Sequence, residues 1–278
     1  MRRTQPSQSS VVLTKKELVL LRSRARELGW TVEQKEGYEL FTSEPPSRLM
    51  VYATGTVVYA GDWAESLLSD ILVPLTFDAV VGSDEAGKGE WYGPLVVVAI
   101  GASDKQLFRM RMLGVRDSKS ISPKGLLRLG DALHRLDVPK GIVVLRCKKY
   151  NELYAKLSKE GKGLNDILAW AHAAAISDAL ASLGDTGDVR VTVDEFDAPR
   201  LASRLGAKNL KYTLVQRHGA EAEPEVAAAS ILAKYIFDTE VKRLESTYNV
   251  KLRGAAPASI PDEVLPEVAK LHFKSVGR

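Results

Sequence analysis

Apolar residues recur at two different spacings along the first 72 residues, and the change of spacing predicts a small α+β unit. Thr14 and Glu17 have the spacing of a capping box, and apolar residues then return every three or four positions up to Gly29, which predicts a helix. Three runs of alternating character follow, at 30–34, 38–42 and 49–60, the last interrupted by a Thr-Gly turn. A second helix over 62–72 completes the predicted order α-β-β-β-β-α.

The rest of the chain alternates β-branched runs with segments of helical spacing, a pattern typical of an α/β domain. The predicted strands begin at Ala79 and lie at 95–100, 142–145, 189–194 and 212–215. The predicted helices begin at Pro123 and Pro199 and lie at 150–157, 164–183 and 226–238. Because Pro74 interrupts the helical pattern, we place a linker at 73–76, between a first domain at 1–72 and a second at 77–278.

The composition is that of a soluble globular protein. The 278 residues are 45% hydrophobic, and no run approaches the roughly 20 apolar residues that a membrane helix needs. We therefore expect a cytoplasmic protein with no membrane partner, whose polar residues 1–10 are disordered. Cys147 is the only cysteine, which excludes an internal disulfide and a cysteine-rich zinc site. The four histidines lack the spacing of metal ligands, so carboxylates must hold any metal.

The charge is compatible with an anionic partner but does not establish one. The formal net charge is +4 and the sequence pI is about 9.0. Residues 1–78 carry 9 Lys and Arg against 10 Asp and Glu, which leaves 30 against 25 for the remainder. The positive excess therefore lies entirely in the second part of the chain.

Candidate chemistry begins where the strand from Ala79 runs into a glycine-rich loop. Asp84 and Glu85 supply the hard oxygen ligands that Mg²⁺ or Mn²⁺ accepts. The glycines of Gly87-Lys88-Gly89 let backbone N–H groups approach a phosphate. Acid pairs are common on solvated surfaces and a lone Gly-x-Gly is a weak signal. An apolar strand on each side of the loop favours a functional site over a solvated face.

Further acids lie at the ends of later elements. Asp194 ends the run 189–194, and the βα alternation predicts that this strand is a neighbour of the one carrying Asp84. On the last long helix Lys234 lies four residues after Ser230, and Asp238 lies eight after it, about two turns at 3.6 residues per turn. Strands often end in an acid, and the small residues of this helix also serve close packing.

These motifs, in this order, resemble those of the type 2 ribonucleases H, and most of all the ribonuclease HIII branch. The run from Asp84 to Gly89, with Gly93-Pro94 after it, resembles the first signature of the family. Lys88 in place of an arginine, followed by Glu90-Trp91-Tyr92, is similar to the HIII branch and not to the HII branch. Three other stretches resemble the family: Asp117-Ser118-Lys119, the Ala-Ser-Ile-Leu-Ala-Lys run that ends at Lys234, and the tail Leu271-His272-Phe273-Lys274.

The resemblance implies a ribonuclease H-like α/β fold, with a mixed five-stranded sheet flanked by helices. It implies that residues 1–72 form a substrate-binding domain that resembles half of a TATA-binding protein. The implied activity is endonucleolytic cleavage of the RNA strand of RNA–DNA hybrids, which leaves 5′-phosphate ends and requires no obligate protein partner. The implied cofactors are two Mg²⁺ or Mn²⁺ ions, which can activate a water and stabilise the leaving oxygen.

The resemblance also assigns residues. The catalytic, metal-binding acids would be Asp84, Glu85, Asp194 and Asp238. The HIII branch varies at the fourth acid, so Glu223 or Glu221 is the alternative to Asp238. The substrate-binding residues would be Gly87, Lys88, Gly89, Lys119, Ser230 and Lys234. Converging carboxylates raise each other's pKa unless a cation neutralises them, which agrees with a metal site.

Several alternatives stay open at the level of sequence. A junction resolvase or an integrase-like nuclease would keep the acids and lose the dependence on the 2′-hydroxyl, because fold does not fix function. An HII-type enzyme would cut at a single embedded ribonucleotide, and a hybrid-binding protein would not turn over. His172 is expected to pack or to orient a neighbour, whereas Trp91 and Tyr92 have no assigned role. In the first domain, substrate contacts are expected around Arg48, Tyr52 and Tyr59.

Overall fold

The computed structural model describes residues 9–72, 76–116, 121–194, 198–206 and 211–276. The chain folds as two compact units. One unit comprises Met1–Thr76 with Asp104–Gly114, and the other comprises Phe77–Ser103 with Val115–Arg278. Residues 73–75 of the expected linker and the Asp-Ser-Lys motif at 117–119 lie outside the described residues. Within the described part, no helix is long and apolar enough to cross a membrane.

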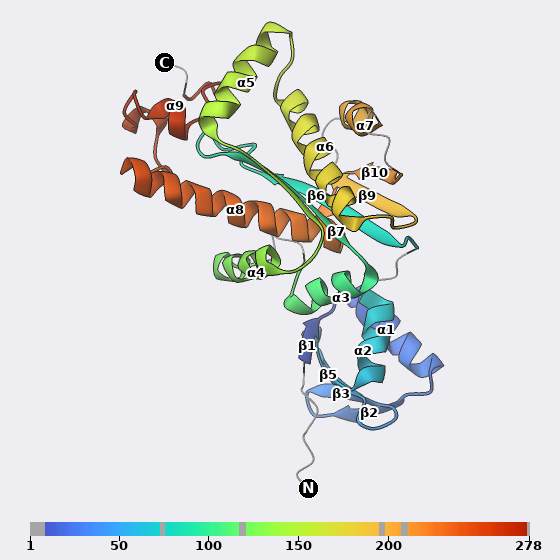
Figure 1. The fold of residues 1–278 in the computed structure, drawn as a ribbon. Helices are drawn as coiled ribbons and strands as arrows, with labels where there is room; N and C mark the ends of the chain where they lie inside the picture. The colour runs from blue at the N-terminus through green and yellow to red at the C-terminus, as the bar shows by residue number, and fades with distance from the viewer. Residues whose placement is uncertain (1–8, 73–75, 117–120, 195–197, 207–210, 277–278) are drawn as a thin grey trace. The chain divides into compact units, whose positions relative to one another are not determined.

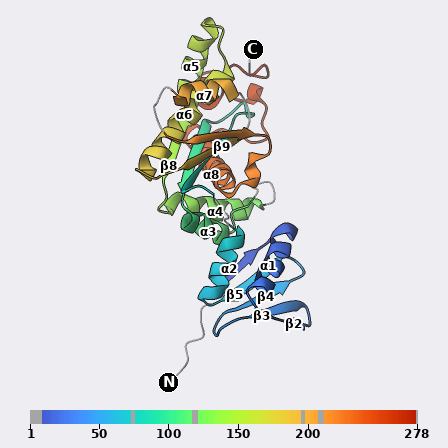
Figure 2. The same cartoon turned by 90° about the vertical axis from the view of Figure 1, so that its right-hand side faces the viewer.

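The N-terminal unit is built on a five-stranded antiparallel sheet of order β1-β5-β4-β3-β2. Its strands are β1 (Ser9–Val12), β2 (Thr31–Lys35), β3 (Tyr38–Thr42), β4 (Arg48–Tyr52) and β5 (Thr56–Ala60). Helices α1 (Lys15–Glu27) and α2 (Asp62–Leu72) lie on the same side of this sheet (Figure 2). The predicted capping box is present, because the Thr14 hydroxyl accepts from Glu17 N at 3.3 Å and the Glu17 carboxylate accepts from Thr14 N at 2.6 Å.

The side chains of this sheet alternate between two faces, as the pleat requires. Leu49 and Val51 of β4 are buried together with their cross-strand partners Tyr59 and Val57. Arg48, Met50 and Tyr52 alternate with them and are half-buried on the other face. The expectation that Tyr59 contacts a substrate is therefore wrong for this structure, since the ring is only 7% exposed.

Two elements of the N-terminal unit differ from the sequence prediction. Ser9 and Ser10, expected to be disordered, belong to β1, which pairs antiparallel with β5. Helix α3 (Asp104–Leu113) was not predicted, and it groups with this unit although it follows a strand of the other. It contacts α2 and β1, and Arg111 pairs with Glu17 at 2.6 Å. Both elements were missed because short polar segments acquire their order from tertiary contacts.

The second unit contains the predicted mixed five-stranded sheet, in the order β10-β9-β6-β7-β8. Its strands are β6 (Ala79–Ala86), β7 (Leu95–Ala102), β8 (Lys140–Leu145), β9 (Val189–Asp194) and β10 (Thr213–Arg217). β6 pairs antiparallel with β7 and parallel with β9, and β9 pairs parallel with β10. All eight residues of β7 are buried, as expected for a strand covered on both faces.

Helices cover both faces of this sheet (Figure 1). α6 (Leu164–Leu183) packs on β7 and β8, and α8 (Pro224–Tyr248) packs on β6 and β7 from the other side. The remaining helices are α4 (Pro123–Arg135), α5 (Cys147–Lys159), α7 (Ala198–Gly206) and α9 (Leu265–Val268). α4 is capped by the Ser122 hydroxyl, which accepts from Gly125 N at 3.2 Å, and it begins at Pro123 as predicted.

The close contact between β6 and α8 depends on one glycine. A Cβ atom at Gly82 would collide with the backbone of Glu225 and Val226 at the start of α8. Because Gly82 lies only two residues before Asp84, the same contact brings α8 against the acidic end of the strand. The small residues Ala227, Ala228 and Ala229 are all buried in this contact region.

Candidate active site

The acid pair lies at the end of β6 and faces both sides of the sheet. Successive residues of a strand point to opposite faces. Asp84 is hydrogen-bonded by the Ser230 hydroxyl of α8, whereas Glu85 contacts His172 of α6 at 3.1 Å. The two carboxylates therefore face opposite layers of the domain, Asp84 toward α8 and Glu85 toward α6.

Glu85 is held as a carboxylate by two cationic or donor groups. His172 Nε2 lies 3.1 Å from one carboxylate oxygen, and Lys88 Nζ lies 2.5 Å from the other. Burial opposes ionisation, but these two groups outweigh it and lower the pKa of Glu85 to about 2. Since an ionised carboxylate only accepts hydrogen bonds, Nε2 is the protonated nitrogen that faces Glu85.

The orientation of His172 is fixed from its other nitrogen. Its ring is fully buried, and Nδ1 lies 2.8 Å from the hydroxyl oxygen of Ser83, which in turn lies 2.9 Å from Val98 O. A chain of contacts thus runs from β7 through Ser83 and His172 to Glu85. His172 orients a site carboxylate, as the sequence led us to expect, and Ser83 is a contributor that the sequence pattern did not reveal.

Asp84 has the opposite electrostatic environment. Burial and the neighbouring charge of Glu85 raise its pKa to about 6, although Ser230 and the backbone N–H of Glu85 both donate to it. A carboxylate in this setting is stabilised in its charged form by a nearby cation. The pair therefore consists of one acid whose neighbours favour its charge and one acid whose charge is disfavoured by burial and by Glu85.

Asp194 joins the pair from the neighbouring parallel strand. β6 and β9 are in parallel register up to Ser83 and Val193, so the next residues, Asp84 and Asp194, lie side by side on neighbouring strands. One Asp194 oxygen accepts from Ala220 N at 3.3 Å, in the turn η2 (Ala220–Ala222) that precedes α8. The predicted convergence of two strand-end acids is present in the structure.

Lys88 lies in the field of all three acids. Burial opposes its charge, but Glu85, and more weakly the two aspartates, outweigh burial and raise the pKa of the Lys88 ammonium. The turn that carries it needs glycine at position 87, where φ is +88° and a Cβ atom would collide with Pro94 O. Lys88 thus supplies the positive charge around which these carboxylates are arranged.

A hollow of about 420 Å³ lies beside the acids. It is lined by the β6 end and its glycine turn together with side chains from α4 and α8: Glu85, Ala86, Gly87, Lys88, Gly89, Glu90, Leu126, Ser230 and Lys234. Five of the six residues expected to bind substrate therefore line one concave surface. The sixth, Lys119, lies outside the described residues.

Asp238 is not brought to this hollow. It lies two turns beyond Ser230, about 12 Å along α8 at 1.5 Å per residue. Its carboxylate pairs with Lys234 at 3.1 Å and with Arg253 at 2.6 Å. Proximity along a helix face suggested this residue, but the helix axis leads away from the strand ends.

The two alternatives to Asp238 differ from each other. Glu223 is engaged by Arg190 at 3.1 Å and by Arg217, and Arg190 also pairs with the fully buried Glu225 at 2.9 Å. Glu221 lies in η2, directly after the residue whose N–H donates to Asp194. Of the three candidates, Glu221 is the one that directly follows a residue, Ala220, bonded to Asp194.

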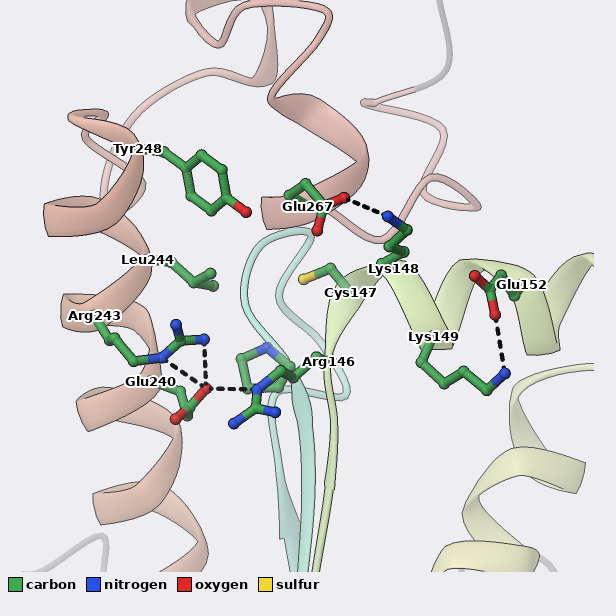
Figure 3. A pocket seen from close by; sticks show the side chains of 11 residues that line it. Arg146, Cys147, Lys148, Lys149, Glu152, Glu240, Arg243, Leu244, Tyr248 and Glu267 are labelled. Carbon is green, nitrogen blue, oxygen red and sulfur yellow. Dashed lines mark hydrogen bonds and ion pairs between the residues drawn. The ribbon is translucent and has the colours of Figure 1, made fainter.

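A larger hollow lies away from the acids, between α5, α8 and α9 (Figure 3). It measures about 520 Å³ and contains four cationic side chains. Arg146 and Arg243 both turn toward Glu240, at 3.4 and 3.0 Å, as Figure 3 shows. Lys148 pairs with Glu267 and Lys149 with Glu152. Because each of these cations has an acidic partner, the larger hollow is less suited to an anion than its composition suggests.

The side chains at the end of β6 offer the kind of ligand atom, carboxylate oxygen, that a hard divalent cation binds. Asp84, Glu85 and Asp194 offer carboxylate oxygens only, and burial together with Glu85 disfavours the charge of Asp84. Among the described residues, no group of three His, Cys, Asp or Glu side chains is already arranged to hold a metal. The reason is visible in the contacts, since Glu85 is turned toward Lys88 and His172.

Comparison with known proteins shows the family to which the chain belongs. The model of the ribonuclease HII family matches residues 81–274. Ribonuclease HIII of Chlamydia caviae is 31% identical over 92% of this chain and 92% of its own length. The crystal structure of Bst-RNase HIII in complex with Mn²⁺ has a TM-score of 0.62 at 22% identity and covers 97% of both chains. That of Aquifex aeolicus RNase H3 has a TM-score of 0.56 at 22% identity and covers 94% of this chain and 98% of its own.

The two structures share the fold, and the match of sequence over both units shows the family. The chain therefore belongs to the ribonuclease HII family and, through its likeness to the chlamydial enzyme, to the ribonuclease HIII branch of these endoribonucleases of RNA–DNA hybrids.

Proposed function

We propose that this chain hydrolyses the RNA strand of RNA–DNA hybrids at the hollow beside β6, with divalent metal ions held by Asp84, Glu85 and Asp194. The observation that carries the proposal is the parallel pairing of β6 and β9, which sets Asp84 and Asp194 side by side near the ends of these strands. Glu85 and Lys88 complete a charged cluster at the rim of a concave surface. Membership of a family of hybrid-cleaving enzymes supports the substrate class.

Mg²⁺ or Mn²⁺ is the cation that the donor set favours, and two ions per site is the number we propose. Bst-RNase HIII was solved in complex with Mn²⁺, which supports this choice. When bound, such ions supply an activated water and stabilise the charge that develops on the leaving oxygen. We propose Glu221 as the fourth acid in place of Asp238, because its turn donates to Asp194.

The protein's own groups would orient the acids and the substrate. Ser230 holds Asp84 from α8, and His172 holds Glu85 from α6. The Gly87-Lys88-Gly89 backbone lines the hollow, where it can approach the RNA strand closely enough to form a hydrogen bond with a 2′-hydroxyl. Lys88 and Lys234 offer ammonium groups to the phosphates at the same surface.

For the N-terminal unit we propose a role in holding the hybrid. The half-buried face of its sheet carries Arg48, Met50 and Tyr52 along β4. The Tyr38 and Tyr52 rings lie 5.5 Å apart, and these two residues are paired across β3 and β4. An arginine and aromatic rings on the same face of a sheet suit contact with a sugar–phosphate backbone. The charge of this part of the chain is near neutral, so its contribution must come from this local face.

Cleavage assays with the full chain test the proposal. Labelled RNA–DNA hybrid, all-DNA duplex and DNA with one embedded ribonucleotide should be compared in Mg²⁺, in Mn²⁺ and in EDTA. We expect rapid cleavage within the hybrid, no cleavage of DNA, poor cleavage at the single ribonucleotide and no turnover in EDTA. Asp84→Asn and Asp194→Asn should each abolish cleavage while the protein stays folded and binds the hybrid. Turnover in EDTA, or equal cleavage of DNA, would refute the assignment.

A further inference from the structure

A buried lysine far along the chain contacts the loop that follows the glycine turn. Lys270 is fully buried, and its Nζ donates to Glu90 O at 2.9 Å and to Tyr92 O at 3.1 Å. Its own backbone N–H donates to Trp91 O at 2.7 Å. One residue therefore satisfies three successive carbonyl groups of the loop.

The neighbours of Lys270 add further bonds to the loop, and we call the residues 268–270 that hold it the clamp. Gly93 N donates to Val268 O at 2.9 Å, and Tyr92 forms a β-bridge with Ala269. The carbonyl of Gly93 accepts from Cys147 Sγ at 3.1 Å. All four carbonyl oxygens from residue 90 to residue 93 thus accept from groups outside the loop, although the loop belongs to neither a helix nor a strand.

The clamp is anchored to α5. The Asn151 amide donates to Ala269 O at 2.9 Å and accepts from Leu271 N at 2.9 Å. The ring of His272 stacks on Tyr154 with centroids 4.3 Å apart. The segment around Lys270 is therefore fixed on both sides, which leaves its ammonium group little freedom to follow a displaced loop.

Stability alone does not account for a lysine at this position. A buried ammonium group costs several kcal/mol of solvation, and an apolar side chain of similar volume is often at least as stabilising. Burial indeed lowers the pKa of Lys270 to about 8. The Tyr150 ring, 5.9 Å from Nζ, offsets the cost only in part. A methionine could fill the volume but could not donate hydrogen bonds to two carbonyl groups. What the lysine adds is therefore a pair of hydrogen bonds that fix the position of the loop.

The clamped loop is continuous with the substrate-facing turn. Gly87 and Gly93 both approach the Phe237 ring so closely that a Cβ on either would contact it. Lys88, between them in sequence, reaches Glu85 at 2.5 Å. The turn at residues 87–89 runs directly into the loop at residues 90–93, and both pack against Phe237. A displacement of residues 90–93 would therefore move Lys88 relative to the acids.

We propose that Lys270 is a positioning residue, which holds the loop from Glu90 to Gly93 and thereby places Lys88 against the catalytic acids. This inference rests on the proposed function, because it predicts an effect on hybrid cleavage. Lys270 itself does not line the hollow, and it reaches the hollow only through the carbonyl group of Glu90, which does line it.

The test uses the full chain with Lys270→Met, and Lys274→Met as the matched control at an exposed lysine of the same segment. We expect Lys270→Met to remain folded and to lower kcat/KM for hybrid at least about tenfold, whereas the control changes it less than about twofold. Hydrogen exchange of the backbone amides at residues 87–94 should accelerate in Lys270→Met, while exchange in β6 and α6 stays slow.

A double-mutant cycle distinguishes positioning from general destabilisation. Lys88→Ala should cost much less in the Lys270→Met background than in the wild type, because Lys88 is already misplaced there. Additive losses, or unchanged amide exchange in the loop, would overturn the proposal. If Lys270→Met does not fold, Lys270→Arg, which keeps the charge but replaces the compact ammonium group by a larger planar one, replaces it in the same measurements.

Wild-type behaviour separates the two levels of inference. A wild type that fails to cleave hybrid refutes the proposed function. An active wild type with an equally active, folded Lys270→Met refutes only the role of Lys270.

Discussion

At the residue scale, two adjacent acids differ because they face different layers. Glu85 meets His172 and Lys88, which lower its pKa, whereas burial and Glu85 raise the pKa of Asp84. The sequence predicted the pair and its partner Asp194, because strand ends in a βα alternation are identifiable from apolar runs. It did not predict that Glu85 is turned toward α6, since His172 is 87 residues away and nothing in the local pattern couples the two.

Two substitutions decide whether Glu221 or Asp238 is the fourth metal-binding acid. Glu221→Gln should reduce kcat at least about tenfold, because its turn is bonded to Asp194. Asp238→Asn should leave kcat within about threefold, because it removes only ion pairs with Lys234 and Arg253, and partly exposed pairs contribute little. Steady-state cleavage of hybrid under matched metal concentrations measures both. The reverse ranking would return the fourth position to Asp238.

The charge of Lys270 should be visible in the pH dependence of stability. Burial lowers its pKa from 10.5 to about 8, against smaller opposing effects of Cys147 and Glu90. Between these values the unfolded chain binds more protons than the folded chain, so raising the pH stabilises the fold. Below about pH 8 the full cost of burying the charge is present.

Urea unfolding of wild type and Lys270→Met isolates this effect from other titrations. From about pH 7 to about pH 10, the free energy of unfolding of the wild type should rise relative to the variant, by at most roughly 1.4 kcal/mol per pH unit. A constant difference between the two proteins across this range would show that Lys270 does not titrate as its burial implies.

At the element scale, the active site depends on how α8 is seated on β6. The start of α4 and both ends of α6 were predictable, because Pro123 and the run 164–183 carry clear start signals and spacing, whereas α8 extends ten residues beyond its predicted end at 238. The path of α8 was not predictable, since it is set by the contact of Gly82 with the backbone of Glu225. This contact decides that Ser230 reaches Asp84 and that Asp238, on the same helix, does not.

Substitution of this glycine should therefore act on both stability and activity. Gly82→Ala forces α8 away from the strand and should cost about 1–3 kcal/mol in the free energy of unfolding. It should also lower kcat, because Ser230 moves with the helix. Gly206→Ala, where no atom lies within 4 Å of a new Cβ, is the matched control. Thermal unfolding together with hybrid cleavage measures both effects, and equal behaviour of the two variants would contradict the role of the contact.

At the scale of the whole molecule, we propose that the N-terminal unit adds contacts with the hybrid to those made at the catalytic unit. Arg48→Ala and Tyr52→Ala, on the half-buried face of the first sheet, should raise KM for hybrid several-fold with little change in kcat, the pattern of lost uniform binding. Arg24→Ala on α1, where the side chain pairs with Glu27, is the control. Assays at two salt concentrations should show a shallower salt dependence only for Arg48→Ala. Equal KM values for the three variants would leave this face without a role in binding.

The grouping of α3 with the first unit has a consequence for biosynthesis. Translation proceeds from the N-terminus at roughly 5–20 residues per second, and domains generally fold as units. When the ribosome has released the chain only as far as Thr76, the first unit still lacks the helix that buries Leu107 and Met110 and supplies Arg111 to Glu17. This helix emerges only after β6 and β7. We therefore expect the nascent N-terminal unit to stay incomplete until the first two strands of the catalytic sheet have left the exit tunnel.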